Sequence, residues 1–110
     1  MSLQIEALPN FTRELKQLKK KYPSILQDVG KLVADLSERP LQGTPLGGNC
    51  YKIRLAISSK GQGKSGGARV ITCVAVMQDK LTLLAIYDKS EQETISDERL
   101  KELRKLADAS

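Results

Sequence analysis

The sequence predicts an α+β fold with the element order β-α-α-β-β-β-α, in which an N-terminal helical hairpin packs on a small, mainly antiparallel twisted sheet and a C-terminal helix follows. Apolar residues recur at helical spacing between Phe11 and Leu36. From Tyr51 to Tyr87 they show the alternating or continuous patterns of strands. Because 110 residues suffice for a single hydrophobic core and are too few for two, we expect one domain over residues 1–110.

The N-terminal third is predicted to contain a short edge strand and two helices. Leu3 and Ile5 alternate with polar neighbours within residues 1–8, as in an edge strand. Asn10 is expected to cap the first helix, and Pro23 to start the second. The apolar stripes of the two helices are Phe11, Leu15, Leu18 and Tyr22, then Ile25, Leu26, Val29, Leu32, Val33 and Leu36.

Three strands are predicted after residue 50. Residues 39–49 have the composition of a loop. Residues 51–58 alternate between an apolar face and a face that carries Lys52 and Arg54. Residues 68–77 and 81–87 are apolar on both faces for much of their length, as expected of central strands.

A final helix is predicted after residue 96. Ser96 is placed to cap it, and Asp97 and Glu98 lie in the first turn, where the helix dipole favours negative charge. The residues expected to face inward are Leu100, Leu103 and Leu106.

Composition narrows the classes of partner and chemistry. The formal net charge is +5, which favours nucleic acid or another anionic partner. The chain has no histidine and therefore lacks the commonest general base and metal ligand. Cys50 and Cys73 match no zinc spacing and are expected to be ordinary core or strand residues, and we expect neither a metal nor a cofactor. With no apolar run of membrane length and no signal peptide, we expect a cytoplasmic protein with reduced thiols.

The charge of residues 39–89 is one-sided, with eight cations against two anions. Lys52 and Arg54 share one strand face, Arg69 begins the neighbouring strand, and Lys89 follows the third. These four cations are expected to converge on one surface that can hold a phosphodiester. A surface that only improves solubility is the alternative.

The connector over residues 60–69 resembles the end of a phosphate-binding P-loop at Gly63-Lys64-Ser65. The full motif needs a glycine where this chain has Ser58, and a helix where a strand is predicted. We therefore discard an NTPase and expect a basic hairpin loop whose Lys60 and Lys64 contact nucleic acid. Further candidates for nucleic-acid contacts lie in the lysine cluster of the first helix, at Lys16 and Lys20.

Three segments resemble the RelE/HigB group of toxins within the RelE/ParE superfamily. They are Tyr51-Lys-Ile-Arg-Leu, Gly67-Ala-Arg-Val-Ile and Ile86-Tyr-Asp-Lys-Ser-Glu-Gln-Glu. The run from Lys64 to Arg69 and the one that follows Ala85 are similar to a HigB-like branch. The resemblance implies the toxin of a type II toxin–antitoxin system, a ribosome-dependent mRNA endoribonuclease. Its implied partners are mRNA, the ribosome and a cognate antitoxin, expected to be a small helix-turn-helix protein encoded next to it.

The resemblance also implies roles for individual residues. Lys52 and Arg54 match the family's basic pair, and Arg69 and Lys89 match its later cations. Ile95 stands near the position of a tyrosine proposed as the general base in RelE. The base is therefore open, and the candidates are Tyr87, Tyr51, Lys52 and Lys64, with Glu91 less favoured.

The hypothesised reaction is attack of a ribose 2′-hydroxyl on the adjacent phosphorus, which gives a 2′,3′-cyclic phosphate and a 5′-hydroxyl. Arg69 and Lys89 are expected to stabilise the phosphorane, and Arg54 is expected to hold the mRNA backbone. Lys52 and Tyr87 are the further residues expected to be catalytic. One alternative is a ParE-like toxin that inhibits gyrase, for which the cationic cluster has no purpose. The other is a non-catalytic RNA-binding module, for which the sheet lacks exposed aromatic residues.

Overall fold

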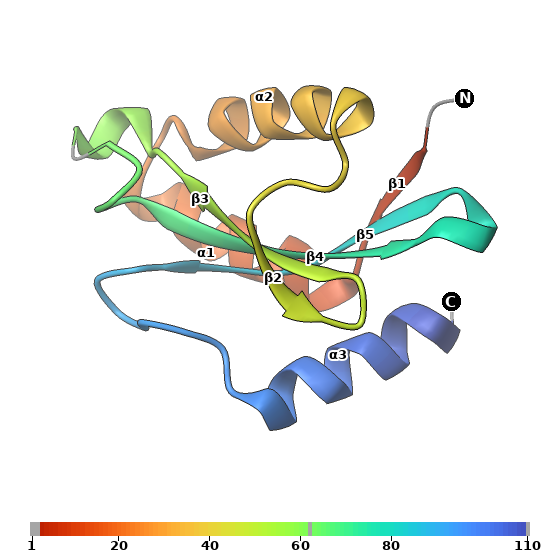
Figure 1. Cartoon of the computed structure of the whole chain (residues 1–110). Helices are drawn as coiled ribbons and strands as arrows, with labels where there is room; N and C mark the ends of the chain where they lie inside the picture. Colours follow the sequence, from red (N-terminus) through yellow and green to blue (C-terminus); the bar gives the residue numbers. More distant parts are fainter. Residues whose placement is uncertain (1–2, 62, 110) are drawn as a thin grey trace.

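Residues 3–61 and 63–109, which the computed structural model describes, form a five-stranded sheet in the order β1-β5-β4-β3-β2 (Figure 1). Strand β1 is parallel to β5, and the other neighbouring strands are antiparallel. The α+β class and the position of β1 at an edge are therefore confirmed. The elements are β1 Gln4–Ala7, α1 Pro9–Lys21, α2 Ile25–Glu38, β2 Thr44–Gly47, β3 Cys50–Leu55, β4 Ala68–Ala75, β5 Lys80–Asp88 and α3 Asp97–Ala109, with short 3-10 turns η1 Ser58–Lys60 and η2 Val76–Gln78.

The predicted loop over residues 39–49 is wrong in its second half, because β2 forms there and pairs with β3. Pro45 is tolerated because proline has no N–H to donate, and the outer side of an edge strand has no neighbouring strand that would accept one. Gly47, Gly48 and Asn49 all have positive φ and make the tight turn into β3. The observed order is therefore β-α-α-β-β-β-β-α, with one strand more than predicted.

Three details of the helices also differ from the prediction. Leu26, placed in the apolar stripe of the second helix, is 44% exposed. Asn10 does not cap α1, which begins at Pro9, and its side chain is buried. Leu106 is 52% exposed, whereas Leu100 and Leu103 are buried as predicted. The Ser96 hydroxyl accepts a hydrogen bond from the Arg99 N–H at 3.1 Å, which confirms the cap of α3. Within residues 3–61 and 63–109, no helix has the length and apolar character needed to cross a membrane.

The sheet lies between two helical layers, with α2 and α3 on opposite sides of it in Figure 1. Helices α1 and α2 bury Phe11, Ile25 and Leu36 against one face of the sheet. Helix α3 covers part of the other face with Leu100 and Leu103. The alternation predicted for residues 51–58 holds in β3: Ile53 and Leu55 point into the α1/α2 layer, so Lys52 and Arg54 belong to the α3 face.

A β-bulge in β5 changes which residues face α3. Ile71 pairs with Ala85 and Thr72 with Leu83, so Leu84 has no partner in β4. Leu84 and Ala85 therefore both pack in the α3 layer. Continued without the extra residue, the Thr72–Leu83 register would bring Ile86 opposite Arg69. With the bulge, Tyr87 takes that place.

Two side chains of α1 satisfy the backbone of β5 beyond the end of β1. The Asn10 side chain donates a hydrogen bond to the Leu84 carbonyl at 2.8 Å. The Glu14 carboxylate accepts one from the Ile86 N–H at 3.1 Å. Asn10 also donates to Glu14 at 3.3 Å, which links the two contacts. Helix α1 thus takes the place of a neighbouring strand along the bulged part of β5.

The two cysteines face each other across β3 and β4. Cys50 is buried and is the register partner of the half-buried Cys73, so both are core or strand residues as predicted. Both are free thiols. A hydrogen bond from Cys50 lowers the pKa of Cys73 to about 7, and Arg104 acts in the same direction.

We predict that Asn10→Ala lowers the free energy of unfolding by about 1–3 kcal/mol, because it leaves the buried Leu84 carbonyl without a donor. Urea denaturation measures the change. Gln17→Ala, at an exposed position of the same helix, is the matched control and is expected to stay close to the parent. Equal losses in both variants would show that the bulge does not depend on Asn10.

Candidate functional site

Two arginines lie directly opposite each other on the α3 face of the sheet. Arg54 of β3 is the register partner of Arg69 of β4, and Arg69 is in turn the partner of Tyr87 of β5. The Cβ atoms of such directly opposed residues are about 4.5–5.5 Å apart, and like charges at this separation destabilise a sheet. An anionic ligand would remove this repulsion.

The four predicted cations line one pocket of about 220 Å³, together with Thr44 and Glu93. We call this the cationic pocket; its cations are Lys52, Arg54, Arg69 and Lys89. Its volume is below the range of about 300–1,000 Å³ that is typical of drug-sized ligands and suits a small polar group such as a phosphodiester. The structure therefore brings together the cations that the sequence placed on one surface.

Arg69 lines the cationic pocket and is held in place by hydrogen bonds to the loop that precedes it. It is only 5% exposed. Its guanidinium donates to the carbonyls of Lys64 at 2.9 Å, Ala68 at 3.0 Å and Ser65 at 3.3 Å. An arginine has five N–H donors, and these three bonds leave two of them without a hydrogen-bond partner among the residues that the structure describes. The basic loop thus fixes the orientation of the arginine before any ligand binds.

Gly67 closes the sheet beside this arginine. A Cβ at Gly67 would lie 2.1 Å from the Leu55 carbonyl oxygen, so only glycine allows β4 to approach β3 this closely. The Gly67 carbonyl accepts a hydrogen bond from the Lys89 N–H at 3.1 Å. Through these contacts Lys89 is held next to the start of β4, on the rim of the cationic pocket.

Tyr87 is buried beside Arg69, its register partner, and is not among the residues that line the cationic pocket. Burial raises the pKa of its phenol, and Arg69 and Thr94 lower that pKa by less. Among the residues that the structure describes, the Tyr87 hydroxyl has no partner within hydrogen-bond geometry. A raised pKa makes the loss of a proton harder, so the environment of Tyr87 favours donation of a hydrogen bond over action as a base.

Lys60 does not line the cationic pocket and instead forms an ion pair with Asp88. Its ammonium lies 2.8 Å from the carboxylate of Asp88, and the side chain of Asp88 is fully buried. Burial alone would raise the pKa of Asp88, but hydrogen bonds from Lys60, Tyr22 and Ser90 outweigh it and hold that pKa well below its ordinary value. The pair joins η1 to the end of β5.

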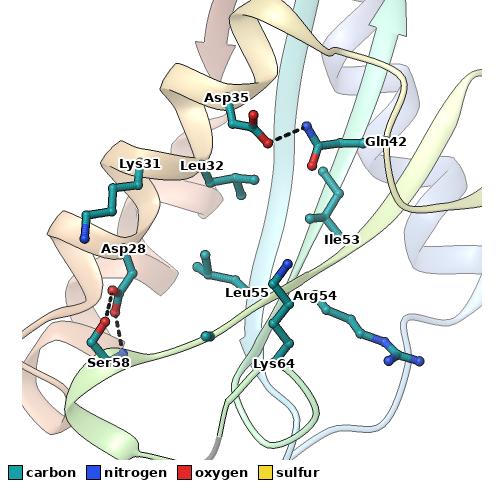
Figure 2. A pocket seen from close by; sticks show the side chains of 11 residues that line it. Asp28, Lys31, Leu32, Asp35, Gln42, Ile53, Arg54, Leu55, Ser58 and Lys64 are labelled. Atoms are coloured by element: carbon teal, nitrogen blue, oxygen red, sulfur yellow. Dashed lines mark hydrogen bonds between the residues drawn. The ribbon is translucent and has the colours of Figure 1, made fainter.

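The other predicted RNA contacts also lie outside the cationic pocket. Lys64 lines a separate groove of about 370 Å³ between α2 and β3, whose acids are engaged: Asp28 accepts from Ser58, and Asp35 from Gln42 (Figure 2). Lys16 and Lys20 are exposed on α1, which covers the opposite face of the sheet. Their contacts with RNA remain predictions.

Two residues of the cationic pocket were not among the predicted site residues. Thr44 lies on β2 and is the register partner of Lys52. It was missed together with its strand. Glu93 lies in the segment between β5 and α3, where the sequence shows only a run of acidic and polar residues. The same residues 3–61 and 63–109 contain no cluster of three or more cysteine and carboxylate side chains that could hold a metal ion.

Comparisons with known proteins give a consistent result. The family model of the RelE toxin of the RelE/RelB toxin–antitoxin system matches residues 11–110. A mutant of the E. coli toxin RelE in the free state is 18% identical, with 84% of this chain and 90% of that chain covered and a TM-score of 0.61. A metal-bound toxin from Helicobacter pylori is 21% identical, with 82% and 98% covered and a TM-score of 0.53. No curated protein sequence matches.

The shared architecture first defines the class: a sheet with helices on both faces, as in RelE-like toxins. Because the family model spans nearly the whole chain, the protein belongs to the RelE toxin family of toxin–antitoxin systems. The predicted resemblance to RelE is confirmed, whereas the HigB-like branch stays a prediction. Membership also implies a cognate antitoxin.

We predict that Lys60→Met lowers the free energy of unfolding at neutral pH by about 3–5 kcal/mol, because it leaves Asp88 buried without its cation. In the parent, the low pKa of Asp88 contributes stability above the unfolded-state pKa of about 3.9, and this contribution is lost as the pH falls through the folded value. In the variant, the hydrogen bond from Lys60 no longer opposes the effect of burial, so the pKa of Asp88 rises. The difference in free energy of unfolding between the variant and the parent should therefore shrink in acid.

Urea denaturation at neutral and acidic pH tests both parts of this prediction. Lys21→Met is the matched control, since Lys21 pairs with Glu91 at 2.6 Å at the surface, with side chains 57% and 59% exposed. Because both side chains are exposed to solvent, its effect on the free energy of unfolding is expected to be small. A Lys60→Met variant as stable as the parent would contradict the ion pair.

Proposed function

We propose that this protein is a ribosome-dependent mRNA endoribonuclease. The observation that carries the proposal is the cationic pocket, in which two directly opposed arginines and two lysines surround a space suited to one phosphodiester. Repulsion between these cations costs folding stability, and a bound anion would offset part of that cost. Membership in the RelE toxin family is consistent with RNA as that ligand.

The proposed chemistry is cleavage by the RNA itself. A ribose 2′-hydroxyl attacks the adjacent phosphorus, and a 2′,3′-cyclic phosphate and a 5′-hydroxyl are formed. In this proposal, Arg69 and Lys89 stabilise the phosphorane oxygens, and the exposed Arg54 binds the mRNA backbone; all three line the cationic pocket. Only RNA carries this nucleophile, so DNA is inert.

The cognate antitoxin and the ribosome are the proposed partners. The ribosome supplies the in-line geometry of the substrate, which amounts to several kcal/mol of entropy that the small pocket alone does not provide. We further propose that the antitoxin is a small helix-turn-helix protein encoded next to the toxin. Codon choice is left to contacts made on the ribosome.

We predict that Arg54→Ala and Lys89→Ala each reduce cleavage of mRNA on programmed ribosomes roughly 10²- to 10³-fold, since each removes a cation that stabilises the phosphorane or its backbone. Primer extension on mRNA, with and without ribosomes, measures the cuts. Lys101→Ala removes an exposed cation of α3 outside the cationic pocket and is expected to cleave like the parent.

The cleavage assay on the parent protein also separates the nuclease from the two alternative functions. A parent protein that makes no ribosome-dependent cuts would refute the nuclease. Salt-sensitive RNA binding without cleavage would then indicate an RNA-binding module, and inhibition of gyrase would indicate a ParE-like toxin.

A further inference from the structure

We propose that Glu93 is the general base that accepts the proton of the attacking 2′-hydroxyl. The proposal rests on the proposed nuclease function and names the group that this function still lacks. Ile95, which the resemblance places near a tyrosine of RelE, has an aliphatic side chain buried in the α3 layer and supplies no proton acceptor.

Glu93 is the acid among the lining residues of the cationic pocket, whose charged neighbours are all lysines or arginines. Other acids nearby in the sequence have partners elsewhere: Asp88 pairs with Lys60, and Glu91 with Lys21. None of the ion pairs among residues 3–61 and 63–109 includes Glu93. Glu93 is exposed to solvent at the pocket, and its carboxylate forms no ion pair with any one of the described cations.

A carboxylate is a poor choice for a site that only binds phosphate. It repels the phosphodiester and lowers the net positive charge that attracts it. A glutamate is ionised at neutral pH and can accept a proton at once, whereas a lysine must first lose one. The position of Glu93 is therefore better explained by proton transfer than by binding.

Both ends of the segment that carries Glu93 are anchored. The Lys89 N–H is bonded to the Gly67 carbonyl at 3.1 Å, and the side chain of Ile95 is buried in the α3 layer. Glu93 lies between these two points and cannot move far from the pocket. The residue that replaces the expected tyrosine thus helps to position an alternative base.

The rival bases are less well placed. Tyr51 packs against the α1/α2 layer, on the other face of the sheet. Lys64 lines the groove beside α2 (Figure 2). Burial raises the pKa of Tyr87, which opposes loss of its proton. Of the candidates considered from the sequence, only Lys52 lines the cationic pocket as Glu93 does.

In the proposed step, a Glu93 carboxylate oxygen takes the 2′-hydroxyl proton while the 2′-oxygen forms its bond to phosphorus. The bond from phosphorus to the 5′-oxygen breaks, and that oxygen takes a proton from the Lys89 ammonium. Protonated Glu93 then loses its proton to water, and Lys89 regains one. No metal, oxidant or further reactant is needed for this balance.

The test compares Glu93→Gln with the parent by single-turnover cleavage of mRNA on programmed ribosomes. Glutamine keeps the size of the side chain and cannot accept the proton, so the rate is expected to fall roughly 10²- to 10⁴-fold. Binding of the same mRNA is expected to be unchanged or tighter, because a negative charge has been removed. Glu98→Gln, in the first turn of α3 outside the pocket, is the control and is expected to cleave at the parent rate.

The pH dependence separates Glu93 from a lysine or tyrosine base. A lysine or tyrosine base, with an ordinary pKa of about 10, makes the rate rise about tenfold per pH unit below that pKa, whereas a carboxylate base adds no such rise. Two results would overturn Glu93 as base and leave the nuclease intact, provided that the parent cleaves. One is a Glu93→Gln variant that cleaves as fast as the parent, and the other is a parent rate that rises steeply with pH. A parent that makes no cuts would overturn both.

Discussion

The hydrogen bonds from α1 to β5 are the contacts on which the candidate site depends. Asn10 and Glu14 bind the Leu84 carbonyl and the Ile86 N–H, groups that lie beyond the last residue paired with β1. They stabilise a strand with one extra residue, and this residue sets the register beyond it. Because of that register Tyr87 lies beside Arg69, and Lys89 follows at the pocket. A polar pair on one side of the sheet thus determines which residues meet on the other.

The convergence of the cations could be predicted from the sequence because it needs only strand alternation and the order of the strands. Lys52 and Arg54 are two residues apart and must share a face. Arg69 follows a short connector and must lie across from them. These are local rules, and tertiary packing did not override them. The same holds for the two helices with clear apolar stripes and for the Ser96 cap.

The remaining features depend on contacts between distant parts of the chain. Asn10 is a good helix cap by type, yet burial beside β5 gives it a better partner in the Leu84 carbonyl. Lys60 looks like a free loop cation, although Asp88, far along the chain, neutralises it. Glu93 is one of two acids in the segment between β5 and α3, and only the fold distinguishes it from Glu91. Strand β2 contains proline and glycine and is formed by its pairing with β3, not by propensity.

The opposed pair of Arg54 and Arg69 has a consequence for the lifetime of the protein. A pocket that is repulsive when empty makes the free chain less stable than the same chain with an anion bound, and the difference grows with ligand concentration. Under the proposed function, a molecule engaged with RNA unfolds less often than an idle one. Proteases act mainly on unfolded chains, so idle molecules are removed first. Under that function, the charge arrangement proposed to serve the chemistry also links turnover of the toxin to its use.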